Sequence, residues 1–199
     1  SCRCFCGGKM NQEEIIQLFK KSNALLKGHF KLSSGRHSDI YYEKFTLLKR
    51  PSICTRICEQ MAKKFKDDQV QTVVGPTTGG IIIAYDIARY MGVEALYAES
   101  GENGRVFKRD FLLDKGQKVI IVDDILTTGK SVFEVIELVK SYKADIVGIG
   151  VMLDRSNGLV KFDYPFYPLA TVSAENWEPQ DCPLCSKGIE LTKRGSREF

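Results

Sequence analysis

Hydrophobic residues follow two different spacings along this chain. In residues 11–27 and 51–66 they recur every three or four positions, which predicts one helix in each segment. Gly28 marks the expected end of the first helix, and Pro51 the expected start of the second. Residues 29–42, between the two helices, are rich in serine, glycine and aromatic residues, so we expect extended chain and turns there.

Beyond residue 70 the pattern changes to short, continuous hydrophobic runs that alternate with amphipathic stretches. The runs lack polar alternation, which is typical of strands that are buried on both faces of a parallel sheet. We therefore expect an α/β fold, in which a twisted parallel sheet is flanked by helices and ligands bind beyond the carboxyl ends of the strands. The expected strands are residues 70–74, 93–97, 119–122, 146–153 and 166–172, and the expected helices are residues 81–91 and 131–142.

Composition and charge limit the classes of protein that the chain can represent. Its 199 residues suit one domain, or one domain with a small appendage. The net charge of +4 is mild and the basic residues are spread along the chain, so we expect no nucleic-acid partner. No hydrophobic run approaches the roughly 20 residues of a membrane span, so we expect no membrane partner either.

The seven cysteines are an odd number, and they point to free thiols in a reducing cytoplasm. Cys54 and Cys58 lie at helical spacing beside hydrophobic residues, so we expect them to be small core residues. Residues 1–9 hold three more cysteines and show no helical or strand period. We expect a tail there, and one folded domain in residues 10–199.

Cys182 and Cys185 form a C-x-x-C pair near the end of the chain. A structural zinc site needs about four ligands, and the three cysteines of the tail are candidates to complete one. We expect instead a turn that carries two thiols, and no metal held by the protein's own ligands.

The loop after the run 119–122 combines carboxylates with a helix start. Free backbone N–H groups and the positive end of the helix dipole suit a phosphate there, and Ser131 and Glu134 have the spacing of a capping box. Carboxylates suit a diol or Mg²⁺-bound water, so the loop matches a ligand that has a phosphate beside a sugar diol. The loop is not a Walker A motif, because the glycine spacing of that motif is absent. The polar residues of the loop are Asp123, Asp124, Thr127, Thr128, Gly129, Lys130 and Ser131.

A second loop of this kind follows the run 70–74. An ordinary tight turn would use the same small residues. Beside the first loop, however, it predicts a second anion site at a neighbouring strand end. Its residues are Gly75, Pro76, Thr77, Thr78, Gly79 and Gly80.

Segment 119–131 resembles the signature with which type I phosphoribosyltransferases bind 5-phosphoribosyl-1-pyrophosphate (PRPP). The resemblance implies that Asp123 and Asp124 meet the ribose hydroxyls, that residues 127–131 surround the 5-phosphate, and that residues 77–80 bind the pyrophosphate. It also implies Mg²⁺ as a cofactor, held through PRPP.

Segment 28–42 resembles the amino-terminal part of orotate phosphoribosyltransferases, which forms a hood over the base. The resemblance implies a small hood in about residues 10–50 and a core in about residues 51–199. Within the hood, Tyr41 and Tyr42 would line the base pocket, although a strand packing pair would look the same. Arg155, after the run 146–153, would face the orotate ring, although a surface arginine in a turn is the alternative. The stretch Ser34, Gly35 and Arg36 would bind substrate, with Arg36 on phosphate or pyrophosphate.

Two departures from this family concern basic residues. Many members carry lysine where this chain has Ser33. Many also have a mobile loop with lysines and a histidine, whose lysine reaches across a homodimer interface. The corresponding residues 98–109 are fewer and lack histidine, so Arg105, Lys108 and Arg109 are the candidates to add catalytic positive charge. A β-hairpin at Asn103-Gly104 is an equally good expectation for this stretch.

The resemblance implies transfer of the phosphoribosyl group from PRPP to orotate, which gives orotidine 5′-monophosphate and pyrophosphate in pyrimidine synthesis. One alternative is a phosphoribosyltransferase for another base, such as a purine. The other is a non-catalytic regulator that senses PRPP or a nucleotide. Orotate-dependent release of pyrophosphate would distinguish the three.

Overall fold

The core of the molecule is a six-stranded sheet with the order β5-β4-β3-β6-β7-β8. The structure is a computed structural model that describes residues 8–32, 35–173 and 175–193. Strands β3, β4, β6, β7 and β8 run parallel, and only the short edge strand β5 is antiparallel. The α/β fold with a parallel sheet, as expected from the hydrophobic runs, is therefore confirmed. The strands are β3 (Thr72–Pro76), β4 (Glu94–Gly101), β5 (Gly104–Val106), β6 (Lys118–Leu126), β7 (Asp145–Asp154) and β8 (Phe166–Thr171).

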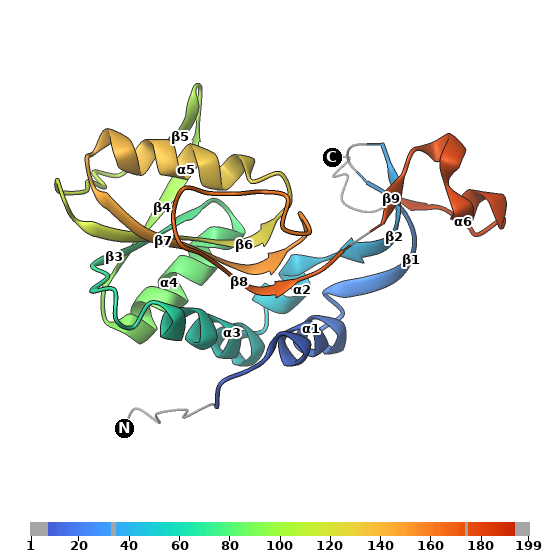
Figure 1. Cartoon of the computed structure of the whole chain (residues 1–199), viewed down its shortest axis with the longest axis horizontal. Coiled ribbons are helices and arrows are strands. Elements are labelled where there is room, and N and C mark those ends of the chain that lie inside the picture. The colour runs from blue at the N-terminus through green and yellow to red at the C-terminus, as the bar shows by residue number, and fades with distance from the viewer. Residues whose placement is uncertain (1–7, 33–34, 174, 194–199) are drawn as a thin grey trace.

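Helices cover both faces of this sheet (Figure 1). Helices α1 (Gln12–Lys21), α3 (Pro51–Lys64) and α4 (Gly79–Met91) lie on one face, and α5 (Lys130–Ser141) lies on the other. The buried strand β6 shows the division, because alternate side chains of a strand point to opposite faces. Ile120 and Val122 belong to the cluster with α1, α3 and α4, whereas Val119 and Ile121 belong to the cluster with α5.

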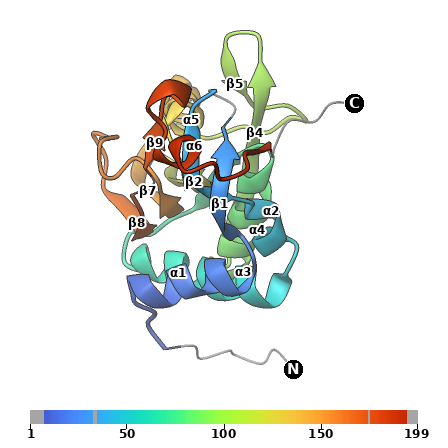
Figure 2. The ribbon, with the colours of Figure 1, turned by 90° about the vertical axis from the view of Figure 1, so that its right-hand side faces the viewer.

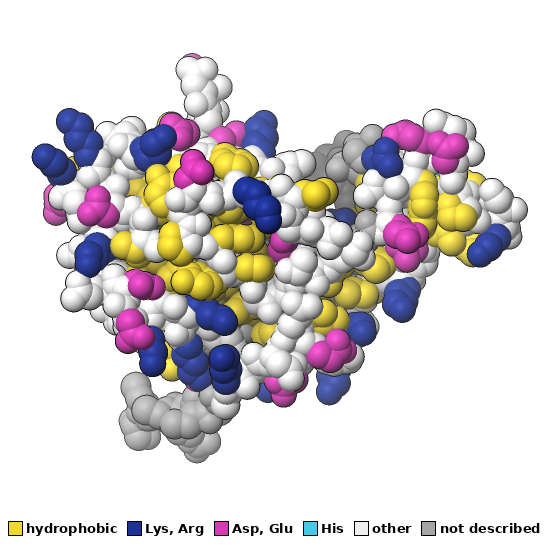
Figure 3. All heavy atoms as spheres, viewed as in Figure 1, with side chains coloured by type: hydrophobic (Ala, Val, Ile, Leu, Met, Phe, Trp, Pro, Cys, Tyr) yellow, Lys and Arg dark blue, Asp and Glu magenta, His cyan; other side chains and the backbone are white. Residues whose placement is uncertain are grey.

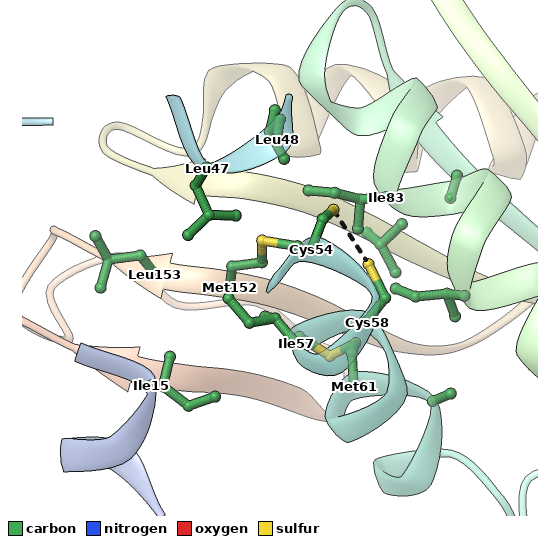
Figure 4. Packing of buried hydrophobic residues seen from close by; sticks show 14 of the residues in the cluster. Ile15, Leu47, Leu48, Cys54, Ile57, Cys58, Met61, Ile83, Met152 and Leu153 are labelled. Atoms are coloured by element: carbon green, nitrogen blue, oxygen red, sulfur yellow. Dashed lines mark hydrogen bonds between the residues drawn. The ribbon is translucent and has the colours of Figure 1, made fainter. Parts of the chain in front are cut away.

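Helix α3 packs closely against the sheet through sulfur-containing and aliphatic side chains (Figure 4). Cys54 and Cys58 are buried, with their sulfurs 3.9 Å apart, which confirms the expectation of core thiols. A β-carbon at Gly150 of β7 would lie 2.3 Å from the sulfur of Met61. Glycine at this position therefore allows the helix to approach the strand.

A second, four-stranded sheet has the order β10-β1-β2-β9, and we call it the hood sheet. Strands β1 and β2 form an antiparallel hairpin from the extended segment that the sequence predicted. The other two strands come from the C-terminal part of the chain, which the sequence did not indicate. Figure 2 shows this assembly, with α6 beside β1 and β2. Its elements are β1 (Leu25–Lys31), β2 (His37–Tyr42), β9 (Asn176–Trp177), η1 (Pro179–Asp181), α6 (Pro183–Ser186) and β10 (Thr192–Lys193).

The predicted helix over residues 11–27 is wrong in its last part. Helix α1 ends at Lys21, and Asn23 takes a positive φ of 56° before the chain enters β1. Leu25 and Leu26 then pair with Tyr42 and Tyr41 across the hairpin. Their spacing fits a helix, but cross-strand pairing determines the structure here.

The remaining predicted helices and strands agree with the structure to within a few residues. The hairpin expected at Asn103-Gly104 is formed by β4 and β5, in which Gly101 pairs with Gly104. Gly92 takes φ 72° directly after α4 and ends that helix. The proposed tail falls mostly on residues 1–7, which lie outside the described residues.

One face of the core carries hydrophobic side chains at its surface, surrounded by charged ones (Figure 3). Between α5 and β8 the rings of Phe133, Phe162 and Phe166 form a chain of contacts, with centroids 4.9 and 5.1 Å apart. In the part of the chain that the structure describes, no helix has both the length and the hydrophobicity to cross a membrane.

Candidate active site

Two helix starts lie side by side at the carboxyl ends of neighbouring strands. Strand β3 leads into α4, and its parallel neighbour β6 leads into α5. Because the carboxyl ends of parallel strands share one edge of the sheet, both predicted anion loops open on the same side of the molecule. The structure therefore brings together the two loops that the sequence indicated.

The loop between β6 and α5 encloses a pocket of about 90 Å³. Such a volume suits a small anion, since pockets for whole drug-sized ligands are several times larger. Gly129 is the N-cap of α5 with φ 78°, and as a glycine it offers no side-chain acceptor to the first turn. The amide of Lys130 makes a long contact, 3.4 Å, with the hydroxyl of Thr128. Backbone N–H groups of the first turn therefore face the pocket as anion donors. The pocket is lined by Asp123, Ile125, Leu126, Thr127, Thr128, Gly129, Lys130, Ser131 and Val132.

The predicted capping box of Ser131 and Glu134 does not form. The helix begins at Lys130, so Ser131 lies inside its first turn and not at the N-cap. Glu134 contacts Arg105 instead, at 3.3 Å from its Nε. Lys130 itself is 82% exposed and lies 3.9 Å from Glu134.

Asp123 and Asp124 are both buried at the end of β6, with 9% and 2% exposure. The amide of Asp124 donates to Asp123 Oδ1 at 2.8 Å, and the amide of Ile125 donates to Asp124 Oδ1 at 2.6 Å. Lys44, at the start of α2 (Lys44–Leu48), lies 3.0 and 2.8 Å from the two oxygens of Asp124. Lys44 was not predicted, because its only signal in the sequence is its position two residues after the tyrosine pair.

Burial, and after it the neighbouring charge of Asp124, raise the pKa of Asp123 to about 7. The backbone amide of Asp124 and the cations Lys44 and Arg105 oppose this shift. Asp123 lines the pocket, whereas Asp124 is held by Lys44. The two carboxylates therefore have different environments, and Asp123 is the one that lines the pocket.

Glycines in the loop between β3 and α4 allow its backbone to lie close to Asp124 and to the rest of the loop. A β-carbon at Gly79 would lie 1.8 Å from Asp124 Oδ2, and one at Gly75 would lie 2.2 Å from the carbonyl oxygen of Gly80. The amide of Thr77 donates to the carbonyl of Ala98 at 2.9 Å, and the Thr77–Thr78 peptide bond is cis. This loop therefore lies directly against the aspartate pair.

Arg105 connects the two loops from the β4–β5 hairpin. Its Nη1 donates to Thr77 Oγ1 at 2.7 Å, and its Nη2 donates to Ser131 Oγ at 3.4 Å. The side chain is only 10% exposed. Lys108 and Arg109 are 53% and 66% exposed and pair with Glu99. Of the three basic candidates, the structure brings only Arg105 between the loops.

Arg155 follows β7 beside the phosphate pocket, because its amide donates to Leu126 O at 2.8 Å. Its guanidinium carbon lies 4.5 Å from the centre of the Tyr42 ring. Burial lowers the pKa of Arg155, and burial raises the pKa of Tyr42 to about 12. Tyr41, the preceding residue of β2, contacts Phe30 with ring centroids 5.6 Å apart.

Two buried polar atoms at this arginine, Arg155 Nε and the hydroxyl of Tyr42, lack a hydrogen-bond partner within the described residues. Asp39 Oδ1, on the same strand as Tyr42, is also buried and unpaired. Buried polar atoms are nearly always paired, so unpaired ones beside a pocket indicate a polar ligand. Asp39 was not predicted, since one aspartate in a polar segment gives no signal.

The remaining predicted residues of the hood lie elsewhere or are not described. Arg36 donates to the backbone carbonyl of Asn176 at 2.9 Å and also contacts Asn176 Oδ1 and Glu178, all in the C-terminal segment. Gly35 takes φ 86° in the turn of the hairpin. Ser34 lies outside the described residues. The structure thus shows Arg36 fixing the C-terminal segment, and its predicted contact with phosphate stays a prediction.

Comparison with known proteins gives consistent results. Residues 46–187 match the family described as phosphoribosyl transferase domain. The chain is 46% identical to the orotate phosphoribosyltransferase of Desulforamulus reducens, over 96% of this chain and 100% of that protein. It is 43% identical to that of Caldicellulosiruptor saccharolyticus, over 95% and 99%. The crystal structure of orotate phosphoribosyltransferase from Aeropyrum pernix superimposes with a TM-score of 0.67 at 27% identity, covering 79% of this chain and 93% of that one.

Proposed function

This chain belongs to the orotate phosphoribosyltransferases, and from that premise we propose how its residues carry out the reaction. The enzyme transfers the 5-phosphoribosyl group of PRPP to orotate, which gives orotidine 5′-monophosphate and pyrophosphate. Departure of pyrophosphate builds positive charge at C1 of the ribose, as in glycosyl transfer generally. The protein supplies no nucleophile, so positioning and electrostatic stabilisation account for the rate.

The phosphate end of PRPP binds in the pocket at the start of α5. The N–H groups of the first turn of α5, together with the hydroxyls of Thr127, Thr128 and Ser131, bind the 5-phosphate. Asp123 and Asp124 accept hydrogen bonds from the ribose hydroxyls. Support comes from the pocket of about 90 Å³ between these groups and from the absence of a side-chain cap at Gly129.

The pyrophosphate binds at the start of α4, against residues 77–80. Arg105 neutralises the charge that develops on this leaving group. The proposal favours Arg105 over Lys108 and Arg109, because Arg105 already contacts Thr77 and Ser131 while the other two pair with Glu99 in solvent. A buried guanidinium stabilises developing negative charge more than an exposed one, since water screens it less.

Magnesium fits the donor set of this site. Mg²⁺ takes oxygen ligands, usually one or two carboxylates and substrate phosphates, and keeps several waters. Asp123, which lines the pocket, would hold it directly or through water, and Asp124 is less available because Lys44 binds it. When bound with PRPP, the ion would neutralise charge on the pyrophosphate.

The base binds between the hood sheet and the turn after β7. Arg155 presents a planar guanidinium with the geometry to bind a carboxylate or a carbonyl of orotate. Asp154 positions this turn, because its carboxylate accepts from the amides of Ser156 at 2.7 Å and Gly158 at 3.3 Å. The single observation that carries the assignment of the base is the unpaired, buried Nε of Arg155, a residue whose backbone amide bonds to Leu126 of the phosphate pocket.

Turnover with different bases tests this proposal. The full-length protein is incubated with PRPP and Mg²⁺, and pyrophosphate release is measured with orotate, adenine or hypoxanthine. We expect release with orotate only. Release with a purine would identify a phosphoribosyltransferase for another base, and PRPP binding without release would identify a regulator.

We further propose that the enzyme is a homodimer in the cytoplasm, as its family resemblance implies. Light scattering should give a mass of twice the 22.4 kDa of one chain. A mass of one chain would contradict the homodimer.

A further inference from the structure

Four metal-binding side chains meet at the edge of the hood sheet, away from the phosphate pocket. They are His29 on β1, His37 on β2, Cys182 before α6 and Cys185 within it. Their ligand atoms all lie within 4.8 Å of one another. The first three are buried, with 2%, 5% and 1% exposure, and Cys185 is exposed. The site proposed for PRPP and orotate uses none of these residues.

The separations fit tetrahedral coordination. Two atoms bound at about 2.0 to 2.3 Å to a tetrahedral centre lie about 3.3 to 3.8 Å from each other. His29 Nε2 lies 3.4 Å from the sulfur of Cys182 and 3.7 Å from that of Cys185. His37 Nδ1 lies 3.3 Å from the sulfur of Cys185 and 3.1 Å from His29 Nε2. These four distances are close to what a shared ion requires.

The ring orientation of His29 also suits a metal. Its Nδ1 lies 2.8 Å from the carbonyl oxygen of Ile189, which can only accept, so Nδ1 carries the proton. In the neutral imidazole the lone pair is then on Nε2, which lies toward the other three groups. One lone pair cannot accept hydrogen bonds from three donors at once, whereas a cation satisfies all four groups. A backbone carbonyl that fixes the tautomer in this way is usual for histidines that bind zinc.

We propose that His29, His37, Cys182 and Cys185 bind a zinc ion that fixes the C-terminal segment to the hood sheet. Two nitrogens and two sulfurs in tetrahedral arrangement are a typical structural zinc site. In the sequence the cysteines of the tail are the candidates for the missing ligands, and the pattern predicts two free thiols. The structure supplies two histidines more than 140 residues away along the chain.

The size of the hood explains why it needs such a link. Strands β9 and β10 have two residues each, and α6 has four, so they bury little hydrophobic surface. Small units of this kind usually need a metal or a disulfide for stability. The same C-terminal segment holds Arg36, and β2 carries Tyr42 of the base pocket. The ion would thereby keep the base-binding side of the enzyme in place.

Metal analysis tests the proposal. The full-length protein, purified without a histidine tag, is equilibrated with Zn²⁺ and freed of loosely bound metal. Its zinc content is then measured by inductively coupled plasma mass spectrometry. We expect one zinc per chain. The variant Cys182→Ser/Cys185→Ser should lose it, whereas Cys54→Ala, in the other thiol pair, should retain it. A wild type with no more zinc than the double variant would overturn the proposal, as would a Cys182–Cys185 disulfide in the purified protein.

Two further measurements separate a zinc site from its alternatives. A Cys2→Ser/Cys4→Ser/Cys6→Ser variant should keep its zinc; loss would assign the ion to the tail and overturn the proposal. Substituting Co²⁺ into the wild-type protein should give the visible bands of tetrahedral cobalt with thiolate charge transfer. Bands of six-coordinate cobalt would contradict the site, even if the double variant failed to fold. Chelation should lower the Tm of the wild type and leave that of the double variant unchanged.

Discussion

The phosphate pocket and the histidine–cysteine cluster are assembled in opposite ways. All residues that line the pocket lie between Asp123 and Val132, on one strand end and one helix start. The cluster takes its ligands from His29, His37, Cys182 and Cys185, at both ends of the chain. A contiguous site leaves a recognisable pattern in the sequence, since each residue is positioned by its neighbours. A site assembled from distant segments leaves scattered residues whose meaning depends on the fold.

The largest expected effect is on the contiguous site. Replacing both carboxylates, Asp123→Asn/Asp124→Asn, should lower kcat/KM for PRPP by about 100- to 10,000-fold, because each charged hydrogen bond contributes about 1.5 to 3 kcal/mol. Steady-state kinetics measure this, and circular dichroism checks the fold. Asp145→Asn, at the exposed start of β7, is the matched control. Near-normal activity of the double variant would remove the role of the aspartates in binding ribose.

Arg105 tests whether a residue from outside the contiguous loop belongs to the same site. Arg105→Met should lower kcat by about 100-fold, the scale expected when one donor to a developing negative charge is lost. Lys108→Met is the control from the same segment and should change kcat less than about threefold, because exposed charges contribute little. Equal losses in both variants would show that the hairpin moves and that burial in the free protein does not identify the catalytic cation.

Arg155 tests the base-binding side. Arg155→Met should raise the KM for orotate by about 10- to 100-fold, since a charged hydrogen-bonding pair contributes about 1.5 to 3 kcal/mol. The KM for PRPP should change much less, and Arg89→Met, on the exposed surface of α4, should change neither. If the KM for PRPP rose more than that for orotate, the two substrates would be placed the wrong way round.

The smallest effect concerns stability. The pKa of Asp123 is raised by burial to about 7 in the folded protein, against about 3.9 when unfolded. Its contribution to stability is therefore full below about pH 4 and is lost as the pH rises to about 7. Asparagine cannot titrate, so Asp123→Asn should be more stable than wild type at pH 8 by at least on the order of 1 kcal/mol. Urea unfolding at pH 8 and pH 4 measures this. A variant that is less stable than wild type at pH 8 would show that hydrogen bonds and nearby cations offset the cost of burying the charged carboxylate.

The same contrast explains what the sequence predicted and what it did not. The strands of the core and the loop 123–131 were predictable, because continuous hydrophobic runs and small residues at a helix start have local physical causes. The end of α1 was not, because Leu25 and Leu26 keep helical spacing while pairing with β2. The capping box failed for a similar reason, since Glu134 contacts Arg105 from a different strand.

Residues from separate segments were the least predictable part of the site. Arg105 could not be told from Lys108 and Arg109 until the hairpin placed it between Thr77 and Ser131. Lys44 and Asp39 gave no signal, since single charged residues in a polar stretch are common. The C-x-x-C pair indicated a possible metal site, but the sequence did not show the other two ligands. His29 and His37 come next to the pair only because the hood sheet brings these segments together.

A crystal structure of the protein with PRPP and Mg²⁺ would show where the sugar phosphate binds. We expect the 5-phosphate in the pocket at residues 127–131, hydrogen-bonded to the backbone at the start of α5, with the ribose hydroxyls on Asp123 and Asp124. PRPP bound elsewhere, or a crystal saturated with PRPP in which this pocket stayed empty, would contradict this expectation.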